Sequence, residues 1–215
     1  MLSQLRKSIK PFSEILAKPF VFLNIYPNIV SSLAIPLALI SANFILQHNF
    51  PYAILFAILA SLMDLIDGAV ARQLKKVSNF GNYYETMVDK VVEIILYSSF
   101  ALFYPIATAF AIGFSMLASY AKPRAALVII TDNRDWPAIG EHAERLLLFM
   151  AGLLLSAFNL KLQFLGMEIM ELSLWAIAAV SLVGAIQRIF YAKKLIAEAE
   201  KKGKLLPYLK KGKER

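Results

Sequence analysis

Long apolar stretches recur along this chain of 215 residues, and they constrain its fold more than any other feature. They cover residues 29–45, 52–63, 91–120, 146–158 and 172–189. A helix that crosses a bilayer needs roughly 20 residues. Dividing the longest stretch at Tyr104-Pro105, and extending the shorter stretches with their polar flanks, gives six crossings. We therefore expect an all-α integral membrane bundle of six transmembrane helices.

The composition supports a membrane protein and narrows its partners. Hydrophobic residues make up 59% of the chain, charged residues make up 18%, and the mean hydropathy is +0.60. Ordinary soluble domains are less apolar. The absence of cysteine excludes disulfides and thiolate metal sites. The net charge of +8 is accounted for by topology and by anionic lipid headgroups, so we expect membrane lipid, and no nucleic acid, as a partner.

The positions of lysine and arginine predict the orientation in the membrane. Nearly all of them lie in the N-terminal arm and in residues 72–76, 122–145 and 188–215. The alternate loops offer only Lys161. Because cytoplasmic loops carry an excess of lysine and arginine, we expect a multi-pass protein of the cell membrane. Both termini would be cytoplasmic, together with the acidic stretch described below.

The two ends of the chain differ from the apolar middle. Apolar residues recur at near-helical spacing in the N-terminal arm, at Leu2, Leu5, Ile9, Phe12 and Leu16. This pattern predicts an amphipathic segment on the membrane surface, broken near Pro11, although a flexible basic arm is an alternative. We expect the last span to end at Gln187-Arg188 and a partly helical tail to follow. The predicted parts are a juxtamembrane arm, a six-helix membrane domain and a basic cytoplasmic tail, at residues 1–26, 27–196 and 197–215.

Four carboxylates stand close together in the otherwise apolar middle of the chain. Asp64 and Asp67 are three residues apart, so on a helix they share one face. Gly81, Glu85 and Asp89 are spaced by four, which places them along one face of the next helix. Two helices joined by a short link pack side by side and antiparallel. The four carboxylates can therefore converge at the cytoplasmic edge of the membrane.

Converging carboxylates need a partner of opposite charge, because they repel one another and lose hydration at the membrane edge. Mg²⁺ or Mn²⁺ prefers oxygen ligands, and either ion leaves coordination sites open for phosphate oxygens. Gly68 and Gly81 remove side chains where a substrate needs close approach. Arg72 offers a planar fork of donors suited to phosphate.

In residue type and spacing, this stretch resembles the signature of the CDP-alcohol phosphatidyltransferase family, D-x2-D-G-x2-A-R-x8-G-x3-D-x3-D. The matching positions are Asp64, Asp67, Gly68, Ala71, Arg72, Gly81, Glu85 and Asp89. One position departs from the signature, since Glu85 stands where the family has aspartate. The longer side chain would shift the metal centre or bind it through both oxygens. The layout of six spans extends the resemblance over most of the chain.

The resemblance implies a reaction and the residues that carry it. A phosphatidyl-type group, built on diacylglycerol or archaeol, would pass from a CDP-linked lipid to an acceptor hydroxyl, with release of CMP. Two Mg²⁺ or Mn²⁺ ions would be held by Asp64, Asp67, Glu85 and Asp89, and Asp89 would also be the catalytic base. The residues implied to contact the CDP-lipid are Asn28, Ser31, Gly68, Ala71, Arg72, Ser78 and Gly81. Similar proteins are commonly dimers, so we expect a homodimer.

Three cations at the cytoplasmic ends of separate spans predict a pocket for an acceptor phosphate: Lys122, Arg145 and Arg188. Their surroundings resemble the phosphatidylinositol-phosphate and archaetidylinositol-phosphate synthase branch of the family, in which matching cations hold inositol phosphate. The resemblance implies a phosphorylated polyol, inositol 1-phosphate, as acceptor. A simpler alternative is that the three cations only satisfy the positive-inside tendency.

Two further alternatives remain open from the sequence. Glycerol 3-phosphate is a possible acceptor, because Asp89-Lys90 is compatible with the branch of the family that uses it. An ion-coupled transporter also places acids and lysines within its spans. A transporter would predict charges near the bilayer midplane and an inverted repeat. Here the acids gather at one membrane face and no repeat is evident.

Overall fold

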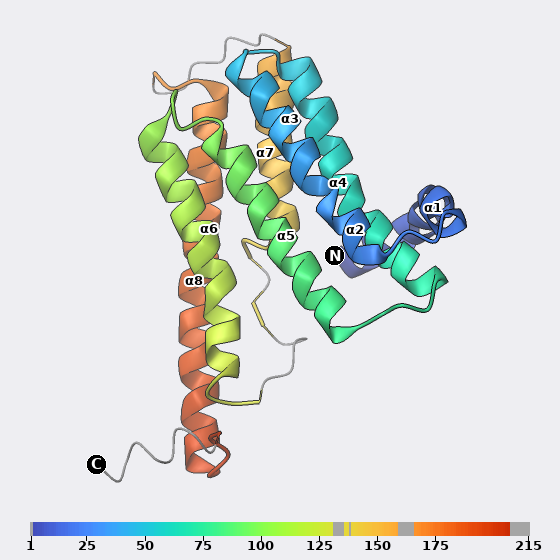
Figure 1. Cartoon of the computed structure of the whole chain (residues 1–215). Coiled ribbons are helices and arrows are strands. Elements are labelled where there is room, and N and C mark those ends of the chain that lie inside the picture. Colours follow the sequence, from blue (N-terminus) through green and yellow to red (C-terminus); the bar gives the residue numbers. More distant parts are fainter. Residues whose placement is uncertain (1, 131–135, 138, 159–165, 207–215) are drawn as a thin grey trace. The chain divides into compact units, whose positions relative to one another are not determined.

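A computed structural model describes residues 2–130, 136–137, 139–158 and 166–206 (Figure 1). Within these ranges the chain forms helices and turns and no strand, which confirms the all-α prediction. The helices are α1 (Leu2–Phe22), α2 (Pro27–Ser32), α3 (Ala34–Leu46), α4 (Phe50–Gln73), α5 (Asn79–Ser98), α6 (Pro105–Ala126), α7 (His142–Ala157) and α8 (Ile169–Lys201).

Among the described residues, three segments are long and apolar enough to cross a membrane: Pro27–Leu46, which comprises α2 and α3, Phe50–Gln73, which is α4, and Ile169–Lys201, which is α8. The other three predicted spans stay a prediction. The chain divides into two compact units, residues 1–102 with 153–160 and residues 103–152 with 161–215.

α3 and α4 lie side by side in the first unit (Figure 1), and most of the side chains buried on both helices are small. Ala34 and Ala38 are buried on α3, and Ala53 and Ala57 are buried on α4. Small residues four positions apart let two helix backbones approach closely within a membrane. The hydroxyl of Ser41 on α3 adds a hydrogen bond to the Ala53 carbonyl, at 2.7 Å.

The N-terminal arm is a single helix, so the expected break near Pro11 is wrong. α1 continues through Pro11 and Pro19. A proline within a helix removes one backbone hydrogen bond, and a helix that gains packing elsewhere can tolerate this loss. That packing is an apolar cluster on α1, α2 and α4, whose buried members are Ala17, Val30, Ile66, Ala69 and Val70. The cluster supports the stretch of α4 that carries Asp67.

Three helices end in the same backbone motif. The residues Asn24, His48 and Lys75 adopt positive φ angles of 49°, 54° and 54° directly after α1, α3 and α4. After α4, the Lys75 amide donates to the Arg72 carbonyl at 3.2 Å and the Lys76 amide donates to Ala71 at 2.9 Å. This is the Schellman pattern, in which the left-handed residue usually is glycine. It turns the chain sharply into the link that precedes α5.

In the second unit α6 packs along α8 (Figure 1). The hydroxyls of Ser115 and Ser181 lie 3.2 Å apart across this contact. α8 continues past Arg188 to Lys201, so the start of the predicted tail is helical as expected, and the end of the membrane span at Gln187-Arg188 stays a prediction. Residues 189–201 contain neither glycine nor proline, and the helix stops just before Gly203, whose φ is +64°.

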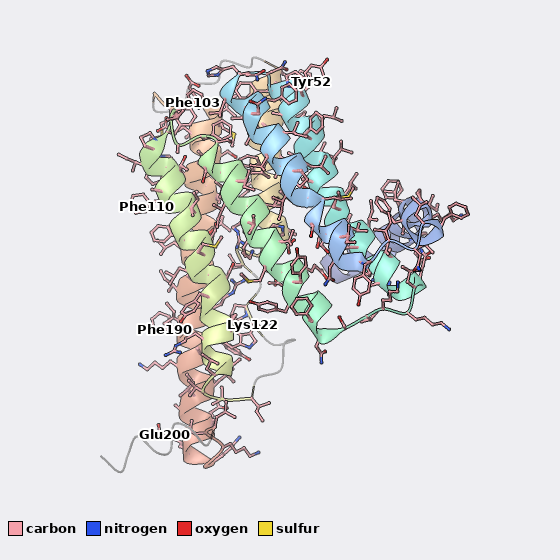
Figure 2. All side chains as sticks on the ribbon, in the orientation of Figure 1. Tyr52, Phe103, Phe110, Lys122, Phe190 and Glu200 are labelled. Carbon is pink, nitrogen blue, oxygen red and sulfur yellow. The ribbon has the colours of Figure 1, made fainter. Side chains whose placement is uncertain are left out.

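Aromatic side chains on α6 and α8 project away from their helices. Figure 2 labels Phe110 on α6 and Phe190 on α8, and both side chains are exposed. Phe110 also packs against Trp175 of α8, with ring centroids 5.6 Å apart. Large exposed apolar side chains on apolar helices suit a hydrocarbon environment rather than water.

Candidate active site

Three of the four predicted metal ligands meet in the first unit. Asp64 and Asp67 on α4 and Glu85 on α5 each offer a carboxylate oxygen, and these oxygens lie within 4.8 Å of one another. The three carboxylates therefore meet, although α5 packs mainly against α3 and only slightly against α4. Asp89 lies one turn after Glu85 on α5 and is half-buried, but it lies outside this group of three.

Asp67 is the most deeply buried of these acids, with 3% of its surface exposed. Its Oδ2 atom accepts a hydrogen bond from the hydroxyl of Ser31 on α2. Its Oδ1 atom is buried, and no hydrogen-bond partner for it exists among the described residues. A buried carboxylate oxygen without a partner costs free energy, and a bound cation would remove this cost. The three carboxylates, with this oxygen among theirs, form a donor set that fits Mg²⁺ or Mn²⁺.

A pocket of about 260 Å³ opens beside Asp67 and Glu85. All seven residues predicted to contact the CDP-lipid line it: Asn28 and Ser31 from α2, Gly68, Ala71 and Arg72 from α4, and Ser78 and Gly81 at the start of α5. The structure thus brings together residues that are up to 53 positions apart in the sequence. The carboxylate cluster and the pocket are one site.

The start of α5 explains why serine and glycine stand at positions 78 and 81. Ser78 caps the helix, since its hydroxyl accepts a hydrogen bond from the Gly81 amide at 2.9 Å. A methyl group at Gly81 would lie 3.1 Å from the Ser78 hydroxyl and 3.6 Å from the Asn28 side chain. At Gly68, by contrast, a methyl group would only touch Arg72, at 3.4 Å. Packing within the described protein therefore does not demand glycine at position 68.

Sequence reasoning missed four residues that also line the pocket: Pro27, Lys76, Val77 and Asn82. Lys76 is the most informative, because it lies on the link between α4 and α5 and carries a charge. Its ammonium donates to the Asn24 side chain at 2.9 Å and lies 5.1 Å from the centre of the Tyr26 ring. The signal that could have found Lys76 is its position between two helices that carry the acids.

Lys90, which follows Asp89, points along α5. Its ammonium lies 3.0 Å from a carboxylate oxygen of Glu93, and the Tyr97 hydroxyl donates to the other oxygen at 3.1 Å. Glu93 is buried, so its charge is balanced by Lys90 and by this hydrogen bond. Lys90 therefore forms a local ion pair with Glu93 on the same helix.

The cations predicted to bind the acceptor phosphate lie in the second unit. Arg188 of α8 donates to the carbonyls of Ala118, Pro137 and Ile139, at 2.8, 3.3 and 3.5 Å. Arg145 of α7 is only 1% exposed and donates to the Gly140 carbonyl. The structure brings these two arginines together, since they donate to the carbonyls of neighbouring residues, Gly140 and Ile139.

Lys122 is the third of these cations and is labelled in Figure 2. It is half-buried on α6, one turn after Ala118, whose carbonyl binds Arg188. Arg145 and Arg188 lie on helices that contact residues 137, 139 and 140, and Lys122 lies on the helix whose Ala118 carbonyl binds Arg188. The sequence did not predict that Arg145 and Arg188 donate hydrogen bonds to backbone carbonyls of residues 137, 139 and 140.

Gly140 and Gly184 let the backbone of residues 139–140 approach α8 closely. Gly140 has a φ of +71°, and a methyl group there would lie 2.8 Å from the Val180 carbonyl oxygen. A methyl group at Gly184 would lie 2.2 Å from the Ile139 carbonyl oxygen. These distances are too short for any side chain, so the segment lies backbone against backbone on α8.

A pocket lined by carboxylates that can hold a divalent cation, and by Arg72 and Lys76, suits chemistry on phosphate groups. The chain belongs to the CDP-alcohol phosphatidyltransferase family, whose sequence profile matches residues 24–189. It is therefore a membrane transferase, and membership in this family decides against an ion-coupled transporter.

The chain is similar to several proteins over most of its length. It is 27% identical over 201 residues to archaetidylinositol phosphate synthase of Pyrococcus horikoshii, covering 90% of this chain and 97% of that one. It is 27% identical over 147 residues to phosphatidylinositol phosphate synthase of Streptomyces avermitilis, covering 64% and 59%. The Mycobacterium tuberculosis phosphatidylinositol phosphate synthase with CDP-DAG bound has the same fold, with a TM-score of 0.69, 20% identity, and coverage of 84% of this chain and 92% of that one.

Proposed function

We propose that this enzyme transfers a phosphatidyl-type group from a CDP-linked lipid to a hydroxyl of inositol 1-phosphate and releases CMP. One observation carries the proposal. Three carboxylates gather beside a pocket, and all seven residues predicted to contact the CDP-lipid line this pocket. The relatives named for inositol phosphate lipids support the choice of acceptor.

The metal site would be formed by Asp64, Asp67 and Glu85, with Asp89 as the fourth ligand of a pair of Mg²⁺ or Mn²⁺ ions. The unpartnered, buried Oδ1 atom of Asp67 supports this assignment. A solved structure of similar fold, at a TM-score of 0.70 and 19% identity, contains manganese and citrate. When bound, the ions supply positive charge that stabilises the negative charge on the donor's diphosphate.

The donor would bind in the pocket between α2, α4 and α5. Arg72 and Lys76 line this pocket with positive charge suited to phosphate oxygens. The open space at Gly68, which packing does not require, leaves room for the donor to lie against α4. Asn28 offers an amide that can bond to a nucleotide, and the lipid chains would extend into the bilayer.

Asp89 would act as the base for the acceptor. It accepts the proton of the attacking hydroxyl while the new O–P bond forms and the P–O bond to CMP breaks, so the leaving group departs with the electron pair. This type of transfer depends more on the positioning of the reactants and on the stabilisation of charge than on covalent catalysis. The half-buried position of Asp89, one turn from Glu85, suits a group that faces both the acids and an incoming alcohol.

The acceptor phosphate would bind to Lys122, Arg145 and Arg188. Arginine has five N–H groups, and the described residues take three of those on Arg188. Phosphate would use the remaining donors, with the backbone carbonyls holding the guanidinium in a fixed direction. We further propose a multi-pass homodimer with its active site and both termini in the cytoplasm.

An assay of purified protein tests this function. The enzyme is given CDP-diacylglycerol or CDP-archaeol with Mn²⁺ or Mg²⁺, and separate reactions contain inositol 1-phosphate, glycerol 3-phosphate, inositol or serine. Mass spectrometry identifies the lipid product, and CMP release gives the rate. We expect turnover with inositol 1-phosphate. Product with glycerol 3-phosphate alone would overturn the acceptor, and absence of CMP release with every acceptor would overturn the proposed function.

A further inference from the structure

We propose that Ser31 is a positioning residue for the metal site rather than a contact for the donor nucleotide. Its hydroxyl would hold the carboxylate of Asp67 so that the second oxygen faces the divalent cation. This inference rests on the proposed function, because it assumes that the carboxylate cluster binds a metal ion.

The hydrogen bonds of Ser31 account for its single hydroxyl proton. Ser31 lies on α2 and is 5% exposed. Its Oγ atom donates to Oδ2 of Asp67, while the Pro27 carbonyl one turn earlier lies farther away, at 3.3 Å. A serine hydroxyl has one proton to donate. Since Asp67 takes that proton, Ser31 does not donate to the phosphate or cytosine of a bound nucleotide.

The carboxylate of Asp67 is asymmetric in a way that suits a metal ligand. One oxygen is bound to Ser31, and the other is buried and has no hydrogen-bond partner among the described residues. Asp67 also offers a carboxylate oxygen within 4.8 Å of oxygens of Asp64 and Glu85. A hydrogen bond to the outer oxygen of a ligating carboxylate fixes its rotation and points the inner oxygen toward the ion. Without Ser31, the carboxylate of Asp67 could rotate about its terminal bond.

The hydroxyl of Ser31 is itself held in place by packing. Val30, its neighbour on α2, is fully buried in the apolar cluster with Ile66 and Val70 of α4. On the other side, the hydroxyls of Ser32 and Tyr84 lie 2.7 Å apart and connect α2 to α5. The helix that carries Ser31 is thereby fixed against both helices that carry the acids. Such support from rigid elements is what a preorganised site requires.

The test compares Ser31→Ala and Ser31→Thr in the full-length protein by titration with Mn²⁺, read by electron paramagnetic resonance without any lipid or nucleotide. We expect Ser31→Ala to weaken Mn²⁺ binding about 10- to 100-fold, the usual effect of losing such a partner. Ser31→Thr keeps the hydroxyl, so its affinity should stay close to that of the parent protein. In the assay with CDP-lipid, Ser31→Ala should require more Mn²⁺ for half-maximal rate, with an unchanged KM for CDP-lipid once Mn²⁺ saturates.

The matched control is Ser41→Ala on α3. Ser41 is also buried, and it lies outside the pocket. Its replacement by alanine removes one hydrogen bond, to the Ala53 carbonyl. Its Mn²⁺ affinity should equal that of the parent protein. If Ser31→Ala does not fold, Ser31→Cys replaces it, because a thiol of similar size is a weak donor.

Two results would overturn the inference. One is parent-like Mn²⁺ affinity in the Ser31 variant that lacks the hydroxyl. The other is a raised KM for CDP-lipid at saturating Mn²⁺ with no change in Mn²⁺ affinity, which would make Ser31 a donor contact. Failure of the parent protein to bind Mn²⁺ would instead overturn the proposed function.

Discussion

Replacing Gly184 by alanine should destabilise the second unit through a single contact. The added methyl group would lie 2.2 Å from the carbonyl oxygen of Ile139 and 3.1 Å from its carbonyl carbon. Carbon and carbonyl oxygen atoms rarely approach closer than about 3.3 Å, so the carbonyl would have to move by about 1 Å. Both contacting groups belong to the backbone, so a change of side-chain rotamer cannot relieve the clash.

The displaced carbonyl is also bound to Arg188. That arginine donates to Ile139 at 3.5 Å and to Pro137 at 3.3 Å, so a shift of about 1 Å would break at least the first hydrogen bond. Overpacking of a tight contact costs about 1–3 kcal/mol. We expect Gly184→Ala to lower the free energy of unfolding by about 2 kcal/mol, the middle of that range.

Gly113→Ala on α6 is the matched control. It changes another glycine within a helix to alanine, but no atom lies within 4 Å of the added methyl group. Alanine is better than glycine inside a helix by about 0.5–1 kcal/mol, so this variant should be equally or more stable than the parent. Thermal unfolding in detergent, followed by circular dichroism, compares the two variants.

For a chain of this size, about 1 kcal/mol corresponds to roughly 2–4 °C in Tm. Gly184→Ala should therefore unfold about 4–8 °C below the parent protein. The reasoning would be refuted if Gly184→Ala unfolded at the same temperature as Gly113→Ala or above it. Such a result would mean that the segment around Ile139 does not lie against α8.

Three further predictions concern the proposed site. Asp89→Asn should lower kcat by about 10²–10⁴-fold, because the amide cannot accept the acceptor's proton, while the Tm stays unchanged; parent-like turnover would exclude Asp89 as the base. Arg145→Ala should raise the KM for inositol 1-phosphate far more than the KM for CDP-lipid in steady-state kinetics, and equal effects would argue against an acceptor pocket. Mn²⁺ at about 100 times its Kd should stabilise the protein by about 2.7 kcal/mol per ion against heat. Asp67→Asn should remove this stabilisation, and a chelator should have no effect on that variant.

Local sequence patterns predicted the parts of this protein that depend on helix geometry. Asp64 and Asp67 share a face of α4 because they are three residues apart, and Glu85 joins them because α5 follows after a short link. Helical spacing alone does not show which acid is deepest. The burial of Asp67 depends on α2, which the chain reaches some forty residues earlier. For the same reason, the bond to Ser31 could not be found from spacing.

The features that sequence reasoning missed arise from contacts between distant segments. Pro11 was expected to break the arm, but packing of α1 against α4 keeps the helix continuous. The donors of Arg188 are directed to carbonyls of residues 118, 137 and 139, and nothing in the spacing of the arginines indicates this. Lys76 became part of the pocket through a left-handed turn at Lys75, a position that glycine normally marks.

The packing of α1 also determines where this protein can be shortened. The family profile begins at residue 24, after the helix has ended. A chain cut at that boundary would lose Ala17 from the apolar cluster that also contains Ile66 and Val70 of α4, on either side of Asp67 in the sequence. Truncation at residue 24 should therefore loosen the stretch of α4 that carries Asp67, although no residue of α1 lines the pocket itself.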